Sequence, residues 1–88
     1  MNSIEFLKQE LSHIYADAVL TLTAPLNASG VWFLDVGING KKAVIQWSDG
    51  NTFGITDITN NDHGYGEAAQ FETKGFLSAL QQITQILD

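Results

Sequence analysis

The sequence predicts a single α+β domain over residues 1–88: an antiparallel meander of three to four strands, with N- and C-terminal helices packed on one face. Three observations lead to this fold class. Apolar residues recur at spacings of three and four near both ends of the chain and at a spacing of two between them. The expected strands are joined by short links, which favour antiparallel neighbours. With 88 residues, 44% of them hydrophobic, the chain has enough material for one small core.

The first helix is predicted to begin at Asn2 or Ser3. Asn2 and Glu5 have the spacing of a capping box, and Ser3 is an alternative N-cap. Apolar residues then follow at helical spacing, and Phe6 and Tyr15 widen the apolar stripe. The residues at helical spacing are Ile4, Leu7, Leu11, Ile14 and Ala18. This pattern is typical of an amphipathic helix of about 12 residues.

A first strand is predicted at Val19–Thr23, where β-branched residues alternate with leucines. The alternation turns Leu20 and Leu22 toward the core, and we expect the segment to be an edge strand. Pro25 and the turn-forming run at residues 27–30 end it.

A β-hairpin is predicted around Asn39-Gly40, a dipeptide that favours two-residue turns. Its strands are Val31–Ile38 and Lys42–Trp47, and the turn fixes their register. The expected pairs are Ile38 with Lys41, Val36 with Ala43, Leu34 with Ile45, and Trp32 with Trp47. The large residues at even positions of the first strand and at odd positions of the second then lie on the same face, which we expect to be the core. The residues expected to be nearly buried are Trp32, Leu34, Ile45 and Trp47, with Leu7, Leu11, Phe76 and Leu80 against them. The indole N–H groups should find acceptors near the end of the sheet.

The next strand is predicted at Thr52–Asp57, after the turn Asp49-Gly50-Asn51. A two-residue loop would turn Phe53 and Ile55 away from the core. A three-residue loop pairs Trp47 with Phe53 and Ile45 with Ile55, and we prefer it because it buries more apolar surface. The stretch from Thr59 to Gln70 has no period and is expected to be the longest loop.

The C-terminal segment predicts a second amphipathic helix, with Thr73 as its N-cap and Gly75 in its first turn. Apolar residues recur at helical spacing, and the polar face carries no charge. The apolar residues are Phe76, Leu77, Leu80, Ile83, Ile86 and Leu87, and the polar ones are Ser78, Gln81, Gln82 and Gln85.

The charge of the chain argues against several classes of partner. It has four lysines, no arginine and ten acidic residues, for a net charge of −6. Residues 1–42 carry four acids and three lysines, whereas residues 43–88 carry six acids and one lysine. Nucleic acids and anionic membrane surfaces are held mainly by basic residues, so neither is expected as a partner. The helix-strands-helix order is that of double-stranded-RNA-binding domains, but the second helix begins with only Glu72 and Lys74 near it.

The composition also limits the chemistry that the chain can perform and the cellular compartment in which we expect it. The absence of cysteine excludes disulfides, thiolate metal sites and a cysteine nucleophile. No apolar run approaches 18 residues, and no basic region precedes a hydrophobic stretch at the start. We therefore expect a cytoplasmic protein.

The loop from Asp57 to Glu67 is the one segment whose residue types suggest a metal. As a calcium loop beginning at Asp57 it fails, because the sixth position is Asp62 rather than glycine and the twelfth is Ala68 rather than glutamate. His63 with neighbouring carboxylates would make only a weak transition-metal site. No nucleophile elbow, zinc-protease motif or phosphate-binding glycine loop is present either. We expect no metal, no cofactor and no catalysis.

The expected outer face of the sheet carries Val31, Phe33 and Val44 among polar neighbours. Three apolar residues on adjacent strands predict an interaction patch, for another protein or for a homodimer. Two other functions stay open. One is an acidic inhibitor that meets a basic partner with Asp49, Asp57, Asp62, Glu67 and Glu72. The other is a small-ligand binder or enzyme that uses the 57–67 loop, with a pocket lined by His63, Tyr65 and Glu67.

Three short motifs give the sequence a resemblance. Trp32-Phe33-Leu34-Asp35 precedes the hairpin turn, Phe53-Gly54-Ile55 follows it, and Asp62-His63-Gly64-Tyr65-Gly66-Glu67 comes later. The pattern resembles that of small bacterial proteins of unassigned function, over less than half of the chain. The resemblance implies a bacterial source and assigns no functional residue.

The chain departs from this family at Ala68-Ala69-Gln70, where such proteins often have a Gly-Pro-Asp-like run. The motif residues Phe53, Gly54, Asp62, His63, Tyr65 and Glu67 are candidates for a binding loop. We favour an architectural role, in which the motif ties the long loop to the sheet and Gly54 marks a bulge or a close packing partner.

Overall fold

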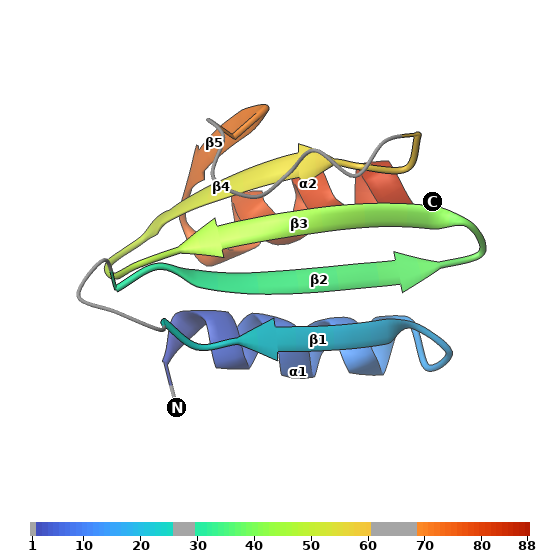
Figure 1. Ribbon diagram of the computed structural model, residues 1–88, viewed down its shortest axis with the longest axis horizontal. Helices are drawn as coiled ribbons and strands as arrows, with labels where there is room; N and C mark the ends of the chain where they lie inside the picture. The colour runs from blue at the N-terminus through green and yellow to red at the C-terminus, as the bar shows by residue number, and fades with distance from the viewer. Residues whose placement is uncertain (1, 26–29, 61–68) are drawn as a thin grey trace.

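A computed structural model describes residues 2–25, 30–60 and 69–88 and confirms an α+β fold (Figure 1). The helices lie at the two ends of the chain, with five strands between them rather than three or four. The elements are α1 (Ser3–Ile14), β1 (Val19–Thr23), β2 (Trp32–Ile38), β3 (Lys41–Trp47), β4 (Thr52–Asp57), β5 (Phe71–Lys74) and α2 (Phe76–Leu87). The strands form one antiparallel sheet in the order β1-β2-β3-β4-β5, which is a meander.

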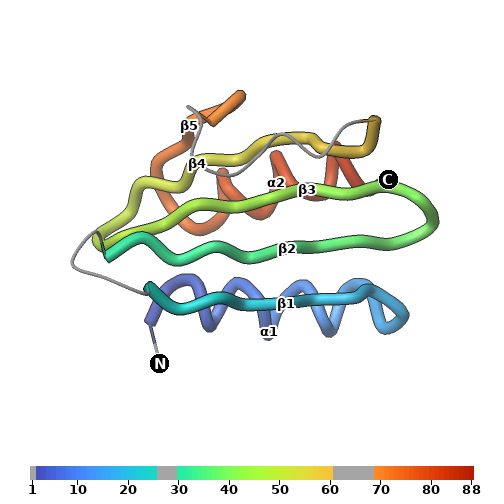
Figure 2. Tube along the Cα trace, viewed as in Figure 1, coloured from blue at the N-terminus to red at the C-terminus, as the bar shows by residue number. Residues whose placement is uncertain are grey.

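The hairpin of β2 and β3 has the predicted register, and its long arms form the middle of the sheet (Figure 2). Leu34 lies opposite Ile45, and Trp32 lies opposite Trp47. Asn39 and Gly40 turn the chain with φ angles of 54° and 80°. Two successive positive φ angles match the right-handed twist of the flanking strands, which is why Asn-Gly fixes the register here.

The pairing of β3 with β4 is also as predicted, with Ile45 opposite Ile55. Gly50 provides the left-handed residue of the connecting turn, with φ of 72°. The carbonyl of Gly50 accepts a hydrogen bond of 3.1 Å from the indole Nε1 of Trp47. Phe53 therefore lies in the core, where it is 1% exposed.

Two predictions around β5 were wrong. The segment Phe71–Lys74 is a strand that pairs with β4, where the sequence predicted no strand and took Thr73 as a helix cap. Thr73 lies opposite Phe53 in that strand, and Gly75, with φ of 95°, stands at the N-cap of α2 without a side-chain hydrogen bond. The sequence of β5 mixes aromatic and charged residues, so its strand conformation depends on pairing with β4 rather than on an apolar alternation.

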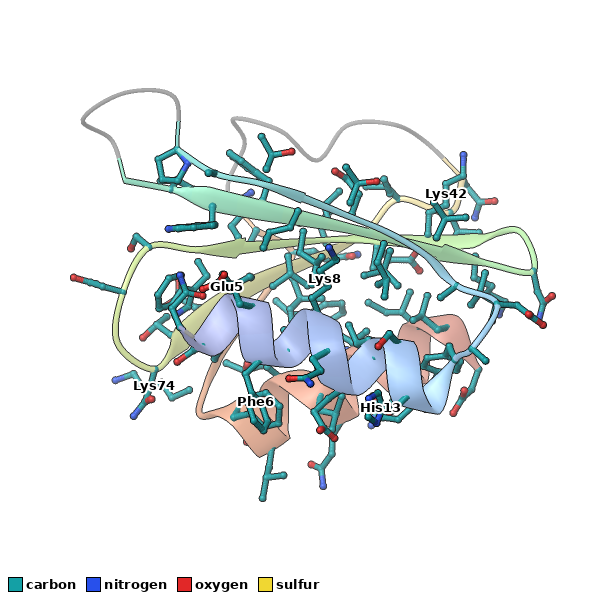
Figure 3. All side chains as sticks on the ribbon, turned by 90° about the horizontal axis from the view of Figure 1, so that it is seen from below. Glu5, Phe6, Lys8, His13, Lys42 and Lys74 are labelled. Atoms are coloured by element: carbon teal, nitrogen blue, oxygen red, sulfur yellow. The ribbon has the colours of Figure 1, made fainter. Side chains whose placement is uncertain are left out.

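Both helices lie on the same side of the sheet and bury its inner face (Figure 3). Ile4, Leu7 and Leu11 of α1 and Ile83 of α2 are fully buried against the strands. Leu34, Ile45 and Trp47 are buried as predicted, whereas Trp32 is only half-buried. Trp32 lies at the start of β2, where the helices no longer cover the sheet completely, and its ring is tilted by 59° against that of Trp47.

Side-chain hydrogen bonds hold the start of α1 and the C-terminal ends of both helices. At the start of α1, Asn2 Oδ1 accepts from the Glu5 amide at 2.9 Å and Glu5 Oε1 accepts from the Asn2 amide at 3.0 Å, as the capping-box spacing predicts. At the other end, Tyr15 Oη donates to Asp88 Oδ1 at 2.6 Å and so links the C-terminal ends of α1 and α2. Burial, and next the hydrogen bond to Asp88, raise the pKa of Tyr15 to about 12.

Candidate interaction surfaces

The outer face of the sheet does not carry the apolar patch that the sequence predicts. Val44 points away from the helices, yet it is fully buried, while Val31 and Phe33 are half-buried. Val44 does not belong to the core cluster beneath the sheet. Ile58, which follows β4, is also buried and also lies outside that cluster. The outer face thus has a second, smaller buried layer, and Val44 is no part of a free surface.

The chain on either side of the 61–68 segment is fastened to this outer layer. The amide of Ile58 donates to the carbonyl of Lys42 at 3.0 Å, and the Lys42 amide donates to Thr59 Oγ1 at 3.1 Å. On the returning side, Gln70 accepts from the Asp57 amide at 3.0 Å through Oε1. The Gln70 amide in turn donates to the side-chain oxygen of Thr56, which lies on β4, at 3.2 Å.

Gly54 lies where the returning chain comes closest to the sheet. A Cβ atom built on Gly54 would be 2.7 Å from the Cβ of Ala69, closer than real Cβ contacts. The structure therefore gives Gly54 a close packing partner, because only a residue without a side chain lets Ala69 rest on β4. Two motif residues, Phe53 and Gly54, thus have architectural positions. The others, Asp62, His63, Tyr65 and Glu67, lie outside the described residues.

The carboxylate of Asp57 accepts a hydrogen bond within the turn that follows β4. Its Oδ1 accepts from the Thr59 amide at 2.9 Å, and the hydrogen bonds from Thr59 lower the pKa of Asp57 below its usual value. A carboxylate held in this way stabilises the turn that leads from β4 toward Ile58. Within residues 2–25, 30–60 and 69–88, no three histidine, aspartate or glutamate side chains gather into a group that could hold a metal ion.

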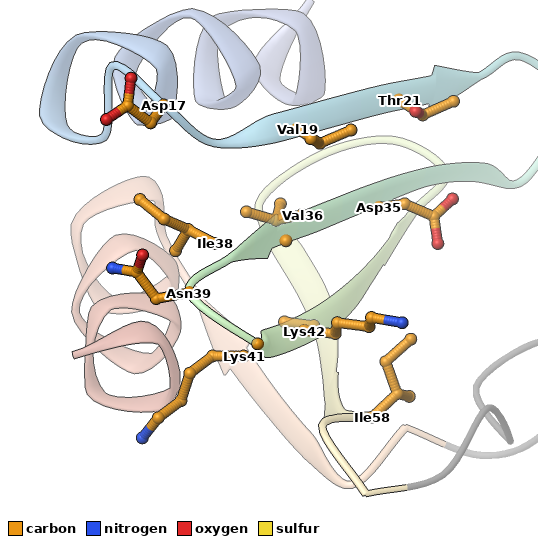
Figure 4. A pocket seen from close by; sticks show the side chains of 13 residues that line it. Asp17, Val19, Thr21, Asp35, Val36, Ile38, Asn39, Lys41, Lys42 and Ile58 are labelled. Carbon is orange, nitrogen blue, oxygen red and sulfur yellow. The ribbon is translucent and has the colours of Figure 1, made fainter.

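Two hollows lie on the outer face. The first has a volume of about 480 Å³ and lies near the β2–β3 turn, where Asp35 and Lys42 are next to the apolar side chains of Val19 and Ile58 (Figure 4). Among the described residues its polar lining consists mainly of Thr21, Asp35 and the lysines at 41 and 42, and it contains no histidine, serine or cysteine. The second, of about 460 Å³, lies toward the other end of the strands between Val31 and Glu72.

The acidic residues proposed for an inhibitor do not form one stripe in the described part of the chain. Asp49 and Glu72 both line the second hollow. Asp57 lies at the opposite end of β4, where its carboxylate is engaged with Thr59. Asp62 and Glu67 lie outside the described residues.

The most exposed apolar cluster lies instead on the helices. Phe6 of α1 is 46% exposed, and its ring meets that of Phe76 edge-on, with centroids 5.0 Å apart and planes at 72°. Leu77, next along α2, is 71% exposed, and Leu80 one turn later is half-buried. Figure 3 shows Phe6 lying beside the start of α2. We call Phe6, Phe76, Leu77 and Leu80 the helix-layer patch.

The sequence contains a signal for this patch, but the patch residues belong to the same apolar series as the buried residues of each helix. Leu77 is part of the apolar series of α2, and the structure places it in solvent. Half of the residues of Phe76–Leu87 are large and apolar, and Leu77 lies about 100° around the helix axis from Phe76, at the margin of their stripe. Phe6 likewise lies at the margin of the stripe of α1. An apolar stripe wider than the core needs is the signal of an additional contact surface.

The fold defines the chain as a two-layer α+β domain, with a five-stranded antiparallel sheet covered on one face by two helices. No family model, no curated protein and no solved structure matches this sequence. Of the helices in the described part of the chain, neither is long and apolar enough to cross a membrane.

Proposed function

We propose that this chain is a small, non-catalytic protein-interaction module that self-associates through the helix-layer patch. The observation that carries the proposal is the exposure of Leu77, 71%, next to the edge-on ring pair of Phe6 and Phe76. One exposed leucine would mean little, since monomers expose much apolar surface. A contiguous cluster drawn from two helices is the kind of patch that marks a contact surface.

Charge favours a second copy as the partner at this surface. The whole chain carries a net charge of −6, but Phe76–Leu87 contains no charged residue. Where α2 of one molecule meets α2 of another, the two helices therefore bring no like charges into contact. A two-fold dimer is the simplest arrangement, because the same patch then serves both molecules.

The proposed setting is the cytoplasm of a bacterium, without nucleic acid, membrane or cofactor as a partner. The cytoplasm is supported by the absence of cysteine, on which small secreted domains usually depend. The bacterial source is supported by the resemblance of the three motifs. The lack of basic residues supports the exclusion of nucleic acid.

Two matched substitutions test the contact surface. Leu77 and Val19 are 71% and 70% exposed, and they lie on opposite sides of the molecule. Leu77→Glu and Val19→Glu add the same charge at nearly equal exposure. Sedimentation equilibrium at about 100 μM should show dimers for the wild type and for Val19→Glu, and monomers for Leu77→Glu, because a charge in a desolvated patch is strongly unfavourable.

Either of two results contradicts the proposal. If the wild type is a monomer at that concentration, the chain does not self-associate as proposed. Dimers that survive Leu77→Glu but dissociate in Val19→Glu move the contact to the other side of the molecule. Thermal unfolding of all three proteins serves as the control for folding.

A further inference from the structure

The two edges of the sheet differ in their protection against a further strand. At one edge, β5 is four residues long and carries Glu72 and Lys74. At the other edge, β1 has the sequence Val-Leu-Thr-Leu-Thr, without charge or proline. Its register with β2 runs unbroken from Val19 opposite Gly37 to Thr23 opposite Phe33, so it contains no bulge. Charges, proline, bulges and short length are the usual ways in which proteins block an edge, and β1 has none of the first three.

The backbone groups that β1 presents at this edge follow from the hydrogen-bond alternation of the sheet. The Ile58 amide donates to the carbonyl of Lys42, so even-numbered residues of β3 direct their backbone toward β4 and odd-numbered ones toward β2. The registers of β3 with β2 and of β2 with β1 carry this alternation to the edge strand. Val19, Thr21 and Thr23 therefore bond to β2. Leu20 and Leu22 direct their N–H and C=O groups outward, where no element of the described chain lies beyond β1 (Figure 1).

The position of α1 decides what can occupy this edge. In Figure 1 α1 lies directly behind β1, and the two elements are in contact. If a second copy paired its own β1 here, the two strands would be about 4.8 Å apart and would bring their helices equally close. Packed helices need about 8–10 Å between their axes. A second copy therefore does not fit, whereas an extended segment without a helix behind it does.

We propose that β1 is a docking edge for an extended segment of another protein, which joins the sheet as a sixth strand. Backbone hydrogen bonds to Leu20 and Leu22 would supply the affinity, as in other cases of strand addition. The side chains of Leu20 and Leu22 are half-buried on the helix side, so the segment should present apolar residues at alternate positions there. On the outer side it would lie beside Val19, Thr21 and Thr23, which favours β-branched residues. The net charge of −6 favours lysine or arginine at its ends.

Hydrogen exchange on the wild-type protein tests the free edge, and a peptide tests the docking. In the free protein, the amides of Leu20 and Leu22 should exchange much faster than those of Thr21 and Thr23, which bond to β2. The probe is the capped peptide Lys-Val-Thr-Val-Thr-Val-Lys at about 1 mM, a concentration that detects weak association. It should shift the amide resonances of Leu20 and Leu22 and slow their exchange at least about tenfold.

The matched control is the same peptide with every backbone nitrogen methylated, which keeps the side chains and removes the N–H donors. It should leave Leu20 and Leu22 unchanged. The proposal is overturned if both amides are already protected in the free protein, if neither responds to the peptide, or if the methylated peptide acts equally. It is also overturned if Glu72 and Lys74 at the β5 edge respond as strongly as Leu20 and Leu22, because the binding would then lack preference for β1.

Discussion

The two sides of the sheet bury their apolar residues by different means. On the inner side, two helices of twelve residues each cover the strands, and Leu34 and Ile45 are fully buried beneath them. On the outer side the described residues form no helix, yet Val44 is equally buried, and Ala69 and Gln70 contact β4. The difference teaches that the side with helices offers the larger exposed apolar cluster. Its helices expose Phe6 and Leu77, whereas the outer side buries Val44 and Ile58 and leaves Val19 exposed on its edge strand.

The largest expected effect is at the centre of the inner side. Leu34→Ala removes a fully buried side chain of β2 from the core cluster, to which both helices contribute residues. We expect a loss of roughly 2–5 kcal/mol in the free energy of unfolding, from lost burial and the cavity left behind. Urea unfolding measures it, and a loss below about 1 kcal/mol would mean that the inner side repacks freely.

The next effect is at the closest approach on the outer side. Gly54→Ala places a methyl group where Ala69 already lies, 2.7 Å away. We expect a loss of about 1–3 kcal/mol from overpacking. Ala69→Gly in the same chain should recover most of it, because the second change removes the clashing atom. A double-mutant cycle that shows no coupling between the two positions would contradict this contact.

Val44→Ala tests whether the outer layer is a packed layer at all. A fully buried valine should lose about 1.5 kcal/mol on truncation, at about 0.8 kcal/mol for each buried methylene-sized group. A surface valine would change the free energy of unfolding by less than about 0.5 kcal/mol. Chemical denaturation of Val44→Ala therefore separates the buried layer from the bare patch that the sequence predicts.

The smallest effect is the pH dependence of the link between the helices. The pKa of Tyr15 is raised from 10.0 to about 12 in the folded chain, chiefly by burial. Because the folded pKa lies above the unfolded one, this contribution to stability is complete below pH 10 and is lost as the pH rises from 10 to 12. Melting temperatures of the wild type should fall more over that interval than those of Tyr15→Phe. Parallel curves for the two proteins would contradict the assignment.

The sequence predicted well toward which face of the sheet each side chain of the hairpin points. The Asn39-Gly40 turn and the alternation of apolar residues give each side chain of the hairpin its face, and the pairing of Leu34 with Ile45 follows from chain geometry alone. The capping box of Asn2 and Glu5 is equally local. Such features depend on residues close together in the sequence, so a single sequence contains them.

The sequence did not predict which side chains of each face are shielded from solvent by other parts of the chain. The alternation correctly directs Val44 away from the helices, but it does not predict that Val44 is buried there. β5 was missed too, since Phe71–Lys74 is a strand only because β4 lies beside it. Leu77 shows the opposite case, since it belongs to the apolar series of α2 and is nevertheless exposed.

The central claim is that molecules of this chain meet through the helix-layer patch and not through the outer face. An isotope-filtered nuclear Overhauser experiment on a mixture of labelled and unlabelled protein detects contacts between copies only. The claim predicts signals from the methyl groups of Leu77 in one molecule to the rings of Phe6 or Phe76 in another. Signals between copies from Val31 or Phe33 instead, or no signals between copies at about 100 μM, the range where weak dimers form, would contradict it.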